Sequence, residues 1–190
     1  MSKLFVDEIV HQSSQGSGTI TIGASGETIN VVGTLQNNGS AVGGTNTPNF
    51  SAVPSGSQSI TQNTWTAINF GTELYDTDSG YDGTNKFTVP TGKGGKYFIN
   101  ANISIDSMSD QVIIIGAIYK NGAVDVGGEN ESLRTRYIMA KNAATATFNV
   151  CGIVEASAGD YFQVYINQND STSRSINTTR TGFRAYKIIE

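Results

Sequence analysis

The sequence predicts an all-β protein, and three observations support this fold class. Apolar residues alternate with polar ones from Phe87 to Val89 and again from Tyr97 to Ile105, on the two sides of a turn with three glycines. Such period-two patterning around a glycine turn indicates two antiparallel strands. The chain has 22 glycines, 3 prolines and 15% charged residues, a composition typical of many short strands. The stretch from residue 50 onward shows no helical period.

Residues 1–12 form the first predicted segment. Their apolar side chains fit either a short strand or one helical turn. The Ser/Gly run that follows separates them from any core, so they need a partner surface to be buried. We therefore predict a docking peptide whose contact residues are Leu4, Phe5, Val6, Ile9 and Val10.

Residues 13–45 contain a small repeat and the start of a linker. Two units, 17–23 and 25–33, each consist of one short strand and a glycine corner, and their Ser-Gly pairs are eight residues apart. One such strand cannot bury its apolar face alone. Copies from other chains would give an intertwined β stalk, whereas a single hairpin against the head is the alternative. The Gly/Asn-rich run 36–49 marks the domain boundary.

Residues 46–190 form the predicted head. About ten short alternating segments follow one another with turn residues between them, which indicates a β-sandwich or jelly roll. The sequence thus predicts a ten-stranded jelly-roll sandwich head after a short trimeric β stalk. The predicted strands are 50–53, 58–61, 65–70, 73–76, 86–89, 96–106, 112–122, 133–140, 144–154, 160–170 and 181–189.

Several motifs of the head follow the order known from one family. "Phe-Thr-Val-Pro", a glycine turn and "Gly-Lys-Tyr-Phe-Ile" stand at the centre, and the other matching pieces are 49–52, 65–70, 73–76, 80–90, 118–122, 159–164 and 182–188. Residues 50–190 resemble the globular head domain of complement component one, subcomponent q, within the tumour-necrosis-factor-like jelly rolls. This resemblance implies a sandwich that assembles as a compact homotrimer with both termini at one end.

The run 112–115 supports assembly independently, because four consecutive apolar residues give a strand two apolar faces. A sandwich buries one face, and an identical chain or the protein's own loops would cover the other. We assign the predicted trimer interface to Val112, Ile113, Ile114, Ile115, Phe183 and Tyr186.

The first 45 residues resemble the opening of small virion proteins of tailed bacteriophages, through "Lys-Leu-Phe-Val-Asp-Glu-Ile", "Thr-Ile-Thr-Ile-Gly" and "Thr-Ile-Asn-Val-Val-Gly-Thr-Leu". In those proteins a docking peptide leads into a stalk and a trimeric head. The resemblance implies a virion location and attachment to other virion proteins. The apolar run of 1–12 is too short for a signal peptide, so we expect synthesis in the host cytoplasm.

Enzyme chemistry has few candidate residues. His11 is the single histidine, and Cys151 is expected to be buried in the apolar run 148–154, so nucleophile–histidine and His-rich zinc sites lack their parts. The net charge is −4, and no Lys or Arg occurs between Lys3 and Lys86. This balance argues against nucleic acid and anionic membranes as partners, and no segment is long enough for membrane insertion.

An acidic loop is the one candidate metal site. Asp76, Asp78 and Asp82 could gather oxygens around Ca²⁺, or could form an ordinary solvated loop. A full twelve-residue calcium loop would need Glu where Phe87 stands. We otherwise expect no cofactor.

Arginines and tyrosines of the head suit either of two roles. They could bind acidic glycans or a neighbouring subunit, or they could form ordinary strand faces and core edges. The residues are Arg134, Arg136, Arg174, Arg180, Arg184, Tyr119, Tyr137, Tyr161 and Tyr165.

The sequence therefore predicts a non-enzymatic phage virion protein: a homotrimeric fibre or appendage whose head binds a host-surface glycan or protein. The loops expected to face that partner are 76–86, 106–111, 124–132 and 167–180. A capsid decoration protein that stabilises the phage head and a glycan-cleaving tailspike are the alternatives.

Overall fold

The computed structural model describes residues 31–33, 36–37, 40–41, 46–123, 133–142 and 144–188. The chain forms two units, Met1–Gly44 and Thr45–Glu190. In the first unit, β1 (Gln36–Asn37) and β2 (Ser40–Ala41) pair as a short antiparallel hairpin. The predicted docking residues and most of the Ser-Gly repeat lie outside the described residues. The docking peptide and the β stalk remain predictions.

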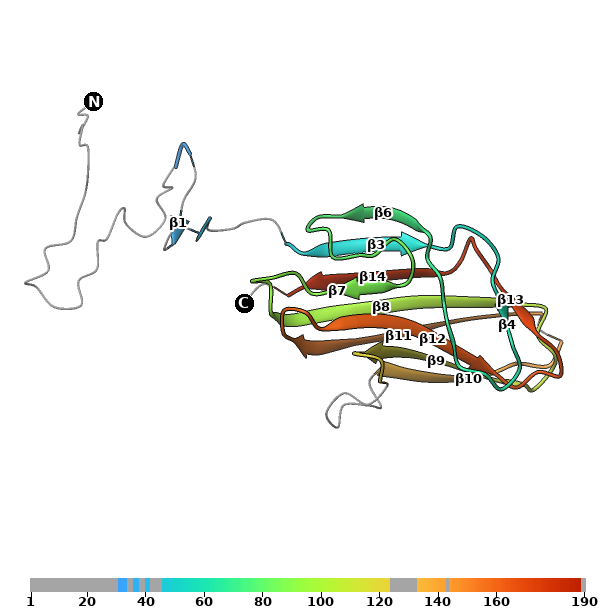
Figure 1. The fold of residues 1–190 in the computed structure, drawn as a ribbon. Coiled ribbons are helices and arrows are strands. Elements are labelled where there is room, and N and C mark those ends of the chain that lie inside the picture. The colour runs from blue at the N-terminus through green and yellow to red at the C-terminus, as the bar shows by residue number, and fades with distance from the viewer. Residues whose placement is uncertain are drawn as a thin grey trace, which may run out of the picture. The chain divides into compact units, whose positions relative to one another are not determined.

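The second unit contains a seven-stranded sheet, in which six strands follow the order β4–β13–β8–β14–β3–β6 and the seventh, β11, pairs with β8 (Figure 1). The central strand is β8, because β11 pairs along the whole of one edge while β14 and β13 share the other. All of these pairings are antiparallel. The strands are β3 (Asn49–Val53), β4 (Ser59–Ile60), β6 (Thr72–Asp76), β8 (Gly95–Asp106), β11 (Thr145–Ala156), β13 (Arg174–Ile176) and β14 (Gly182–Lys187).

A five-stranded antiparallel sheet forms the second layer. Its order is β10–β9–β12, and β5 and β7 share the remaining edge of β12. The strands are β5 (Thr66–Ala67), β7 (Lys86–Thr88), β9 (Ile113–Lys120), β10 (Arg134–Ile138) and β12 (Tyr161–Gln168).

The core lies between the two sheets and is built from alternate residues of each strand. Phe50 of β3 stacks on Phe87 of β7 with the ring centroids 4.5 Å apart, and both side chains are fully buried. On β9, Gly116 faces inward, since a Cβ there would lie 2.7 Å from side-chain atoms of Ile103 and Phe148. The odd-numbered neighbours of Gly116 on β9 therefore face away from the core.

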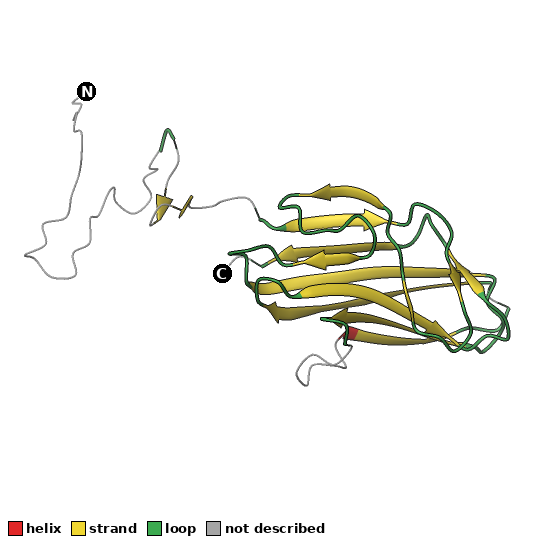
Figure 2. Ribbon diagram, in the orientation of Figure 1, coloured by secondary structure: helices red, strands yellow, loops and turns green. Residues whose placement is uncertain are grey.

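The all-β prediction is confirmed, and the two-layer sandwich is consistent with a jelly roll (Figure 2). Within the described residues there is no α-helix, and thus no helix that could span a membrane. The alternation predicted for 96–106 is confirmed by β8. The strands predicted at 58–61 and 65–70 shorten to two residues each. The short strand β13 lies in a segment predicted to be a loop, because its three residues carry too little pattern to be recognised.

The sandwich has two ends, a near end and a far end. The near end is where β3 begins, at Asn49, and where β14 ends, at Lys187. At the far end, β8 is followed by the loop 107–112 and β12 by the loop 169–173. Figure 1 shows β3 and β14 reaching the left of the view and β4 and β13 at its right.

Candidate functional site

The outer face of the seven-stranded sheet carries an apolar strip. Tyr186 of β14, Phe98 of β8 and Ile153 of β11 stand opposite one another in the strand register. The rings of Phe98 and Tyr186 are in contact, with centroids 5.3 Å apart. Tyr186 is 41% exposed and Ile153 is 54% exposed. Tyr75, 51% exposed on β6, pairs with Ser51 of the same sheet. We name Tyr75, Phe98, Ile153 and Tyr186 the apolar strip.

The same face continues toward the far end as a row of amides. Asn100 donates a hydrogen bond to Asn149, and Asn102 donates one to the carbonyl of Arg180. Cys151 stands opposite Asn100 and is exposed. The expectation that Cys151 is buried is therefore wrong. The run 148–154 is apolar at almost every position, so its composition cannot show which residues of β11 face inward.

The residues of the predicted trimer interface lie in three different places. Ile114 and Phe183 are fully buried in the core of their own chain, so they offer no surface to a second copy. Ile113 and Ile115 lie half-buried on the outer face of the five-stranded sheet, and Val112 precedes them. Tyr186, on the opposite side of the sandwich, belongs to the apolar strip. These six residues cannot form one continuous patch, and the assembly role of the exposed ones remains a prediction.

The outer face of the five-stranded sheet carries an aromatic cluster. Tyr119 of β9 and Tyr165 of β12 stack with centroids 4.1 Å apart, and Trp65, just before β5, lies 5.9 Å from Tyr119. The guanidinium of Arg134 lies over the indole ring of Trp65, 5.4 Å from its centroid. The pKa of Tyr119 lies above its ordinary value, because burial and the neighbouring Tyr165 raise it more than Arg134 lowers it. We name Trp65, Tyr119, Arg134 and Tyr165 the aromatic face.

The strand register explains how the aromatic face is assembled. Arg134, Ala117, Tyr165 and Ala67 lie in one row across β10, β9, β12 and β5. Ala117 is fully buried although it is not part of the core between the sheets. Since Ala117 faces outward, the surrounding large side chains must cover it. Tyr119 and Tyr165, stacked on each other, are the nearest large side chains that can do so.

Sequence reasoning identified Tyr119, Tyr165 and Arg134 separately and did not bring them together with Trp65. The four residues are far apart in the chain, and only the strand register makes them neighbours. Of the other tyrosines considered, Tyr137 stacks on Phe148 at the edge of the core. Tyr161 lies under the ammonium of Lys86, which is 5.4 Å from its ring centroid.

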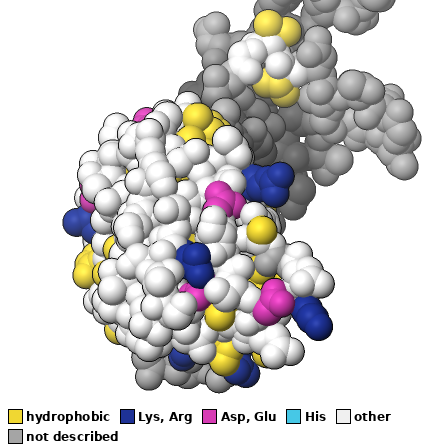
Figure 3. Space-filling view, turned by 90° about the vertical axis from the view of Figure 1, so that its right-hand side faces the viewer, with side chains coloured by type: hydrophobic (Ala, Val, Ile, Leu, Met, Phe, Trp, Pro, Cys, Tyr) yellow, Lys and Arg dark blue, Asp and Glu magenta, His cyan; other side chains and the backbone are white. Residues whose placement is uncertain are grey.

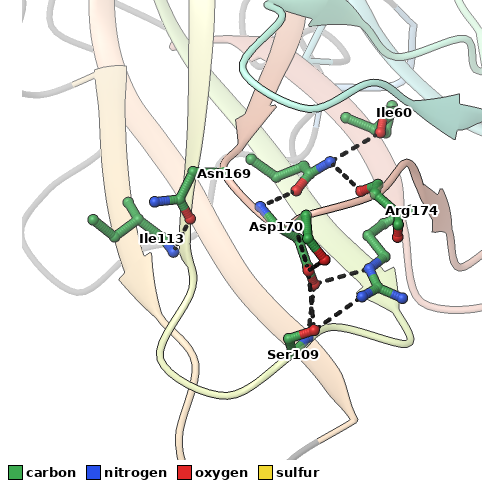
Figure 4. A network of polar contacts seen from close by, with 9 residues as sticks. Ile60, Ser109, Ile113, Asn169, Asp170 and Arg174 are labelled. Carbon is green, nitrogen blue, oxygen red and sulfur yellow. Dashed lines mark hydrogen bonds and ion pairs between the residues drawn. The ribbon is translucent and has the colours of Figure 1, made fainter.

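A buried carboxylate ties the far end together (Figure 4). Asp170 is 1% exposed and accepts hydrogen bonds from Arg174 Nε at 2.8 Å and from the backbone N–H of Ser109 at 2.7 Å. It also accepts from Ser171. The hydrogen bond from Arg174 lowers the pKa of Asp170 and burial raises it. The donors of Ser109 and Ser171 lower it further, so the pKa lies below its ordinary value. We name Ser109, Asp170 and Arg174 the carboxylate clamp.

Gln168 extends the carboxylate clamp into the sheets. Its amide donates to the carbonyls of Ile60 at 3.1 Å and Thr172 at 3.0 Å, and its oxygen accepts from the N–H of Asp170. The clamp thus joins the loop after β8, the end of β12 and the start of β13, which belong to different sheets. This arrangement supports the loops at the far end, because the buried carboxylate of Asp170 has its hydrogen-bond donors within the protein.

The predicted partner-facing loops do not form one surface. Loops 106–111 and 167–180 meet at the far end through the carboxylate clamp, whereas 76–86 lies at the near end, where Thr77 donates to the carbonyl of Asn49. Segment 124–132 is outside the described residues. Figure 3 looks onto the far end, whose surface is mostly uncharged with Lys/Arg and Asp/Glu side chains scattered over it.

The three carboxylates of the acidic loop turn toward different partners. Asp76 accepts from the N–H of Tyr81, and Asp78 pairs with Lys93 at 3.2 Å. Burial raises the pKa of Asp82, but the N–H groups of residues 84–86 lower it below the ordinary value. No group of three His, Cys, Asp or Glu side chains is placed to hold a metal ion in the described part of the chain. Calcium binding by this loop stays an untested prediction.

Comparison with known proteins identifies the type of fold. No protein-family model and no curated protein sequence matches this chain. Among solved structures, murine APRIL matches with a TM-score of 0.55 and 14% identity over 74% of this chain and 98% of its own. The globular domain of zebrafish complement 1qA protein matches with a TM-score of 0.55 and 15% identity over 75% and 98%. The head has a tumour-necrosis-factor-like jelly-roll fold. At these identities the likeness concerns the fold alone.

Proposed function

We propose that this chain is a non-enzymatic virion protein of a bacteriophage, which works as a homotrimer and presents its head for attachment. The observation that carries the assembly part is the apolar strip. Three of its four side chains are 41 to 54% exposed in a single copy. Exposed apolar side chains that gather on one face of a protein mark an interaction site. A second copy is the simplest partner, because every chain supplies the same strip.

We infer three copies per assembly from the fold type, and we infer the virion location from the sequence. A head that resembles the tumour-necrosis-factor-like jelly rolls implies a trimer. The resemblance of residues 1–45 to the openings of phage virion proteins supports attachment through the N-terminus. A tail fibre and a capsid decoration differ in what residues 1–12 bind. Electron microscopy of labelled virions distinguishes the two locations.

The test of assembly is the mass of the full chain in solution. Size-exclusion chromatography with light scattering at micromolar concentration is expected to give three times the chain mass of 20.1 kDa. Tyr186→Glu would place a charge in the apolar strip, where burial of an unpaired charge is unfavourable, and should give single chains. The matched control is Tyr161→Glu, on the other sheet, which should leave the mass unchanged. A folded wild-type protein of single-chain mass would refute the proposal.

A further inference from the structure

We propose that the aromatic face binds oligosaccharides that carry carboxylates. In this proposal the rings of Trp65, Tyr119 and Tyr165 stack on the apolar C–H faces of sugar rings, while Arg134 and Arg136 bind the sugar carboxylates. The proposal deepens the attachment part of the proposed function, because it names the surface and the class of ligand. It does not require the chain to form a trimer.

The first argument is the shape of the surface. Tyr119 and Tyr165 are already stacked, and contact between Trp65 and Tyr119 extends the ring surface across the sheet. The side chains around Ala117 cover it completely. Trp65, Tyr119 and Tyr165 are all half-buried, so they are held in place and still accessible. A preformed cluster of accessible rings suits the C–H face of a pyranose, whose hydrogens meet the negative face of a ring.

The second argument is charge. The outward positions of the five-stranded sheet that the structure describes include Lys86, Arg134 and Arg136 and no Asp or Glu. None of these three cations is in an ion pair with a carboxylate of the described residues. Elsewhere in the head, Lys93, Lys120 and Arg174 each pair with an Asp. In a chain of net charge −4, this local excess of positive charge favours an anionic ligand.

The type of cation indicates which class of anion the surface would bind. Arg134 and Arg136 are two residues apart on β10, so both side chains leave the same face of the sheet. Both are exposed. A guanidinium presents its N–H groups in a plane that matches a carboxylate with two parallel hydrogen bonds. The contact of Arg134 with Trp65 places this guanidinium beside the rings, within reach of a carboxylate on a bound sugar.

Neutral polar groups beside the rings suit sugar hydroxyls. Gln163 lies between Tyr161 and Tyr165 on β12, and its amide donates to Asn85 at 2.8 Å. Asn85 in turn donates to Asn69 at 3.1 Å. This chain of amides holds Gln163 at the margin of the aromatic face. Amide groups can both donate to and accept from a hydroxyl.

Single-stranded nucleic acid is the main competing ligand for a surface of rings and cations. Its affinity comes largely from several phosphate contacts along a basic groove. Here the described cations are three, and the rest of the chain is acidic. We therefore favour the glycan, and nucleic acid serves as one arm of the test.

The experiment uses Trp65, the single tryptophan of the chain, as the reporter. The full-length protein is titrated with tetrasaccharides of galacturonate, of mannuronate and of hyaluronan, and then with maltotetraose and a ten-residue oligothymidylate. Tryptophan emission and isothermal titration calorimetry follow the binding. At least one uronate-containing tetrasaccharide is expected to bind and to change the emission, while maltotetraose and the oligonucleotide bind at least tenfold more weakly.

Two variants connect the binding to the aromatic face. Arg134→Gln and Arg136→Gln should each weaken uronate binding about tenfold or more, since each loses a charge-assisted contact. Arg180→Gln, at an exposed position of the far end, makes the same charge change and should bind as the wild type does. Among the described residues, Arg134 and not Arg136 has a cation–π contact with a ring of the aromatic face, so the Arg136 variant also guards against a folding defect in Arg134→Gln.

The proposal is overturned if no uronate tetrasaccharide binds by either method, if maltotetraose or the oligonucleotide binds equally well, or if both arginine variants bind like the wild type. Repeating the titration with Tyr186→Glu separates the two proposals. Unchanged uronate binding by single chains upholds the glycan site whatever the assembly, whereas trimers without uronate binding refute the glycan site alone.

Discussion

The two outer faces of the head differ in the kind of side chains that they present to solvent. The seven-stranded sheet exposes the apolar strip beside a row of amides, and its outward charges balance, as with Lys96 opposite Glu155. The five-stranded sheet exposes stacked rings among three cations, with no carboxylate at its described outward positions. The first face gains most by being removed from water, whereas the second is suited to a charged ligand that can leave again.

This difference separates what determines the fold from what determines function. The inner faces of both sheets follow the same rule, with alternate apolar residues buried in one core. The fold therefore constrains the outward positions little, and each sheet has its own outward chemistry. The contrast between the two faces depends on the sheets being held as one body, on the apolar strip being covered and on the aromatic face being free.

The largest expected effect concerns the carboxylate clamp, which joins loops of the two sheets. Asp170→Asn removes the charge that Arg174 and Ser109 contact, and should lower the free energy of unfolding by about 3 kcal/mol, because a buried pair loses one partner. The pKa of Asp170 is lowered in the folded state, so its contribution is complete above the unfolded-state pKa of about 4. The deficit of the variant should therefore shrink as the pH falls below about 4. Urea denaturation from pH 7 to pH 3 measures it.

The control for this prediction is Glu73→Gln, an exposed position on β6 with the same change of charge. It should change the free energy of unfolding by less than about 0.5 kcal/mol. A deficit in Asp170→Asn that is equal to that of the control would show that the carboxylate clamp does not join the sheets.

A matched pair of substitutions compares the two faces directly. Ile153 lies in the apolar strip and is 54% exposed, and Ile138, at the edge of the five-stranded sheet, is 55% exposed. Ile153→Asp should dissociate the assembly at micromolar concentration, since it buries a charge between copies, whereas Ile138→Asp should not. Light scattering of both variants measures the mass. Dissociation by Ile138→Asp alone would move the interface to the other face.

The smallest expected effect is on the reactivity of Cys151. This thiol is exposed in a single copy and lies on the same outer face as the apolar strip. If copies cover that face, maleimide should modify Cys151 several-fold more slowly in the wild type than in Tyr186→Glu. Mass spectrometry of timed samples gives both rates. Equal rates would indicate that the face stays open in solution.

The sequence was sufficient for the fold class and for most strands, because alternation on a half-buried strand is a local pattern. The alternation in β8 gives its core face residue by residue, from Tyr97 to Ile105. Alternation fails where a strand is apolar on both faces, as around Cys151. It also fails where a strand is too short, as in β13. The run 112–115 was rightly interpreted as a strand with two apolar faces, but the sequence could not show which positions face outward.

The candidate surfaces were less accessible to sequence reasoning. Tyr186 and Phe183 were both predicted to lie in a trimer interface, but Tyr186 is exposed in a single copy whereas Phe183, three residues earlier, is fully buried. The aromatic face depends on the register between β9, β10 and β12, which joins residues 119, 134 and 165. No local pattern specifies this register, because pairing between distant strands is set by the whole core.

The position of β14 has a consequence for the synthesis of the protein. This strand lies between β8 and β3, so the β3–β6 pair has no connection to the rest of the sheet until residues 182–187 have been made. A ribosome-bound nascent chain must therefore hold β3 and β6 apart from the sheet, with the edge of β3 that β14 will cover still open, until nearly the whole chain has been made. Such a chain is open to chaperones and to proteases for most of its translation.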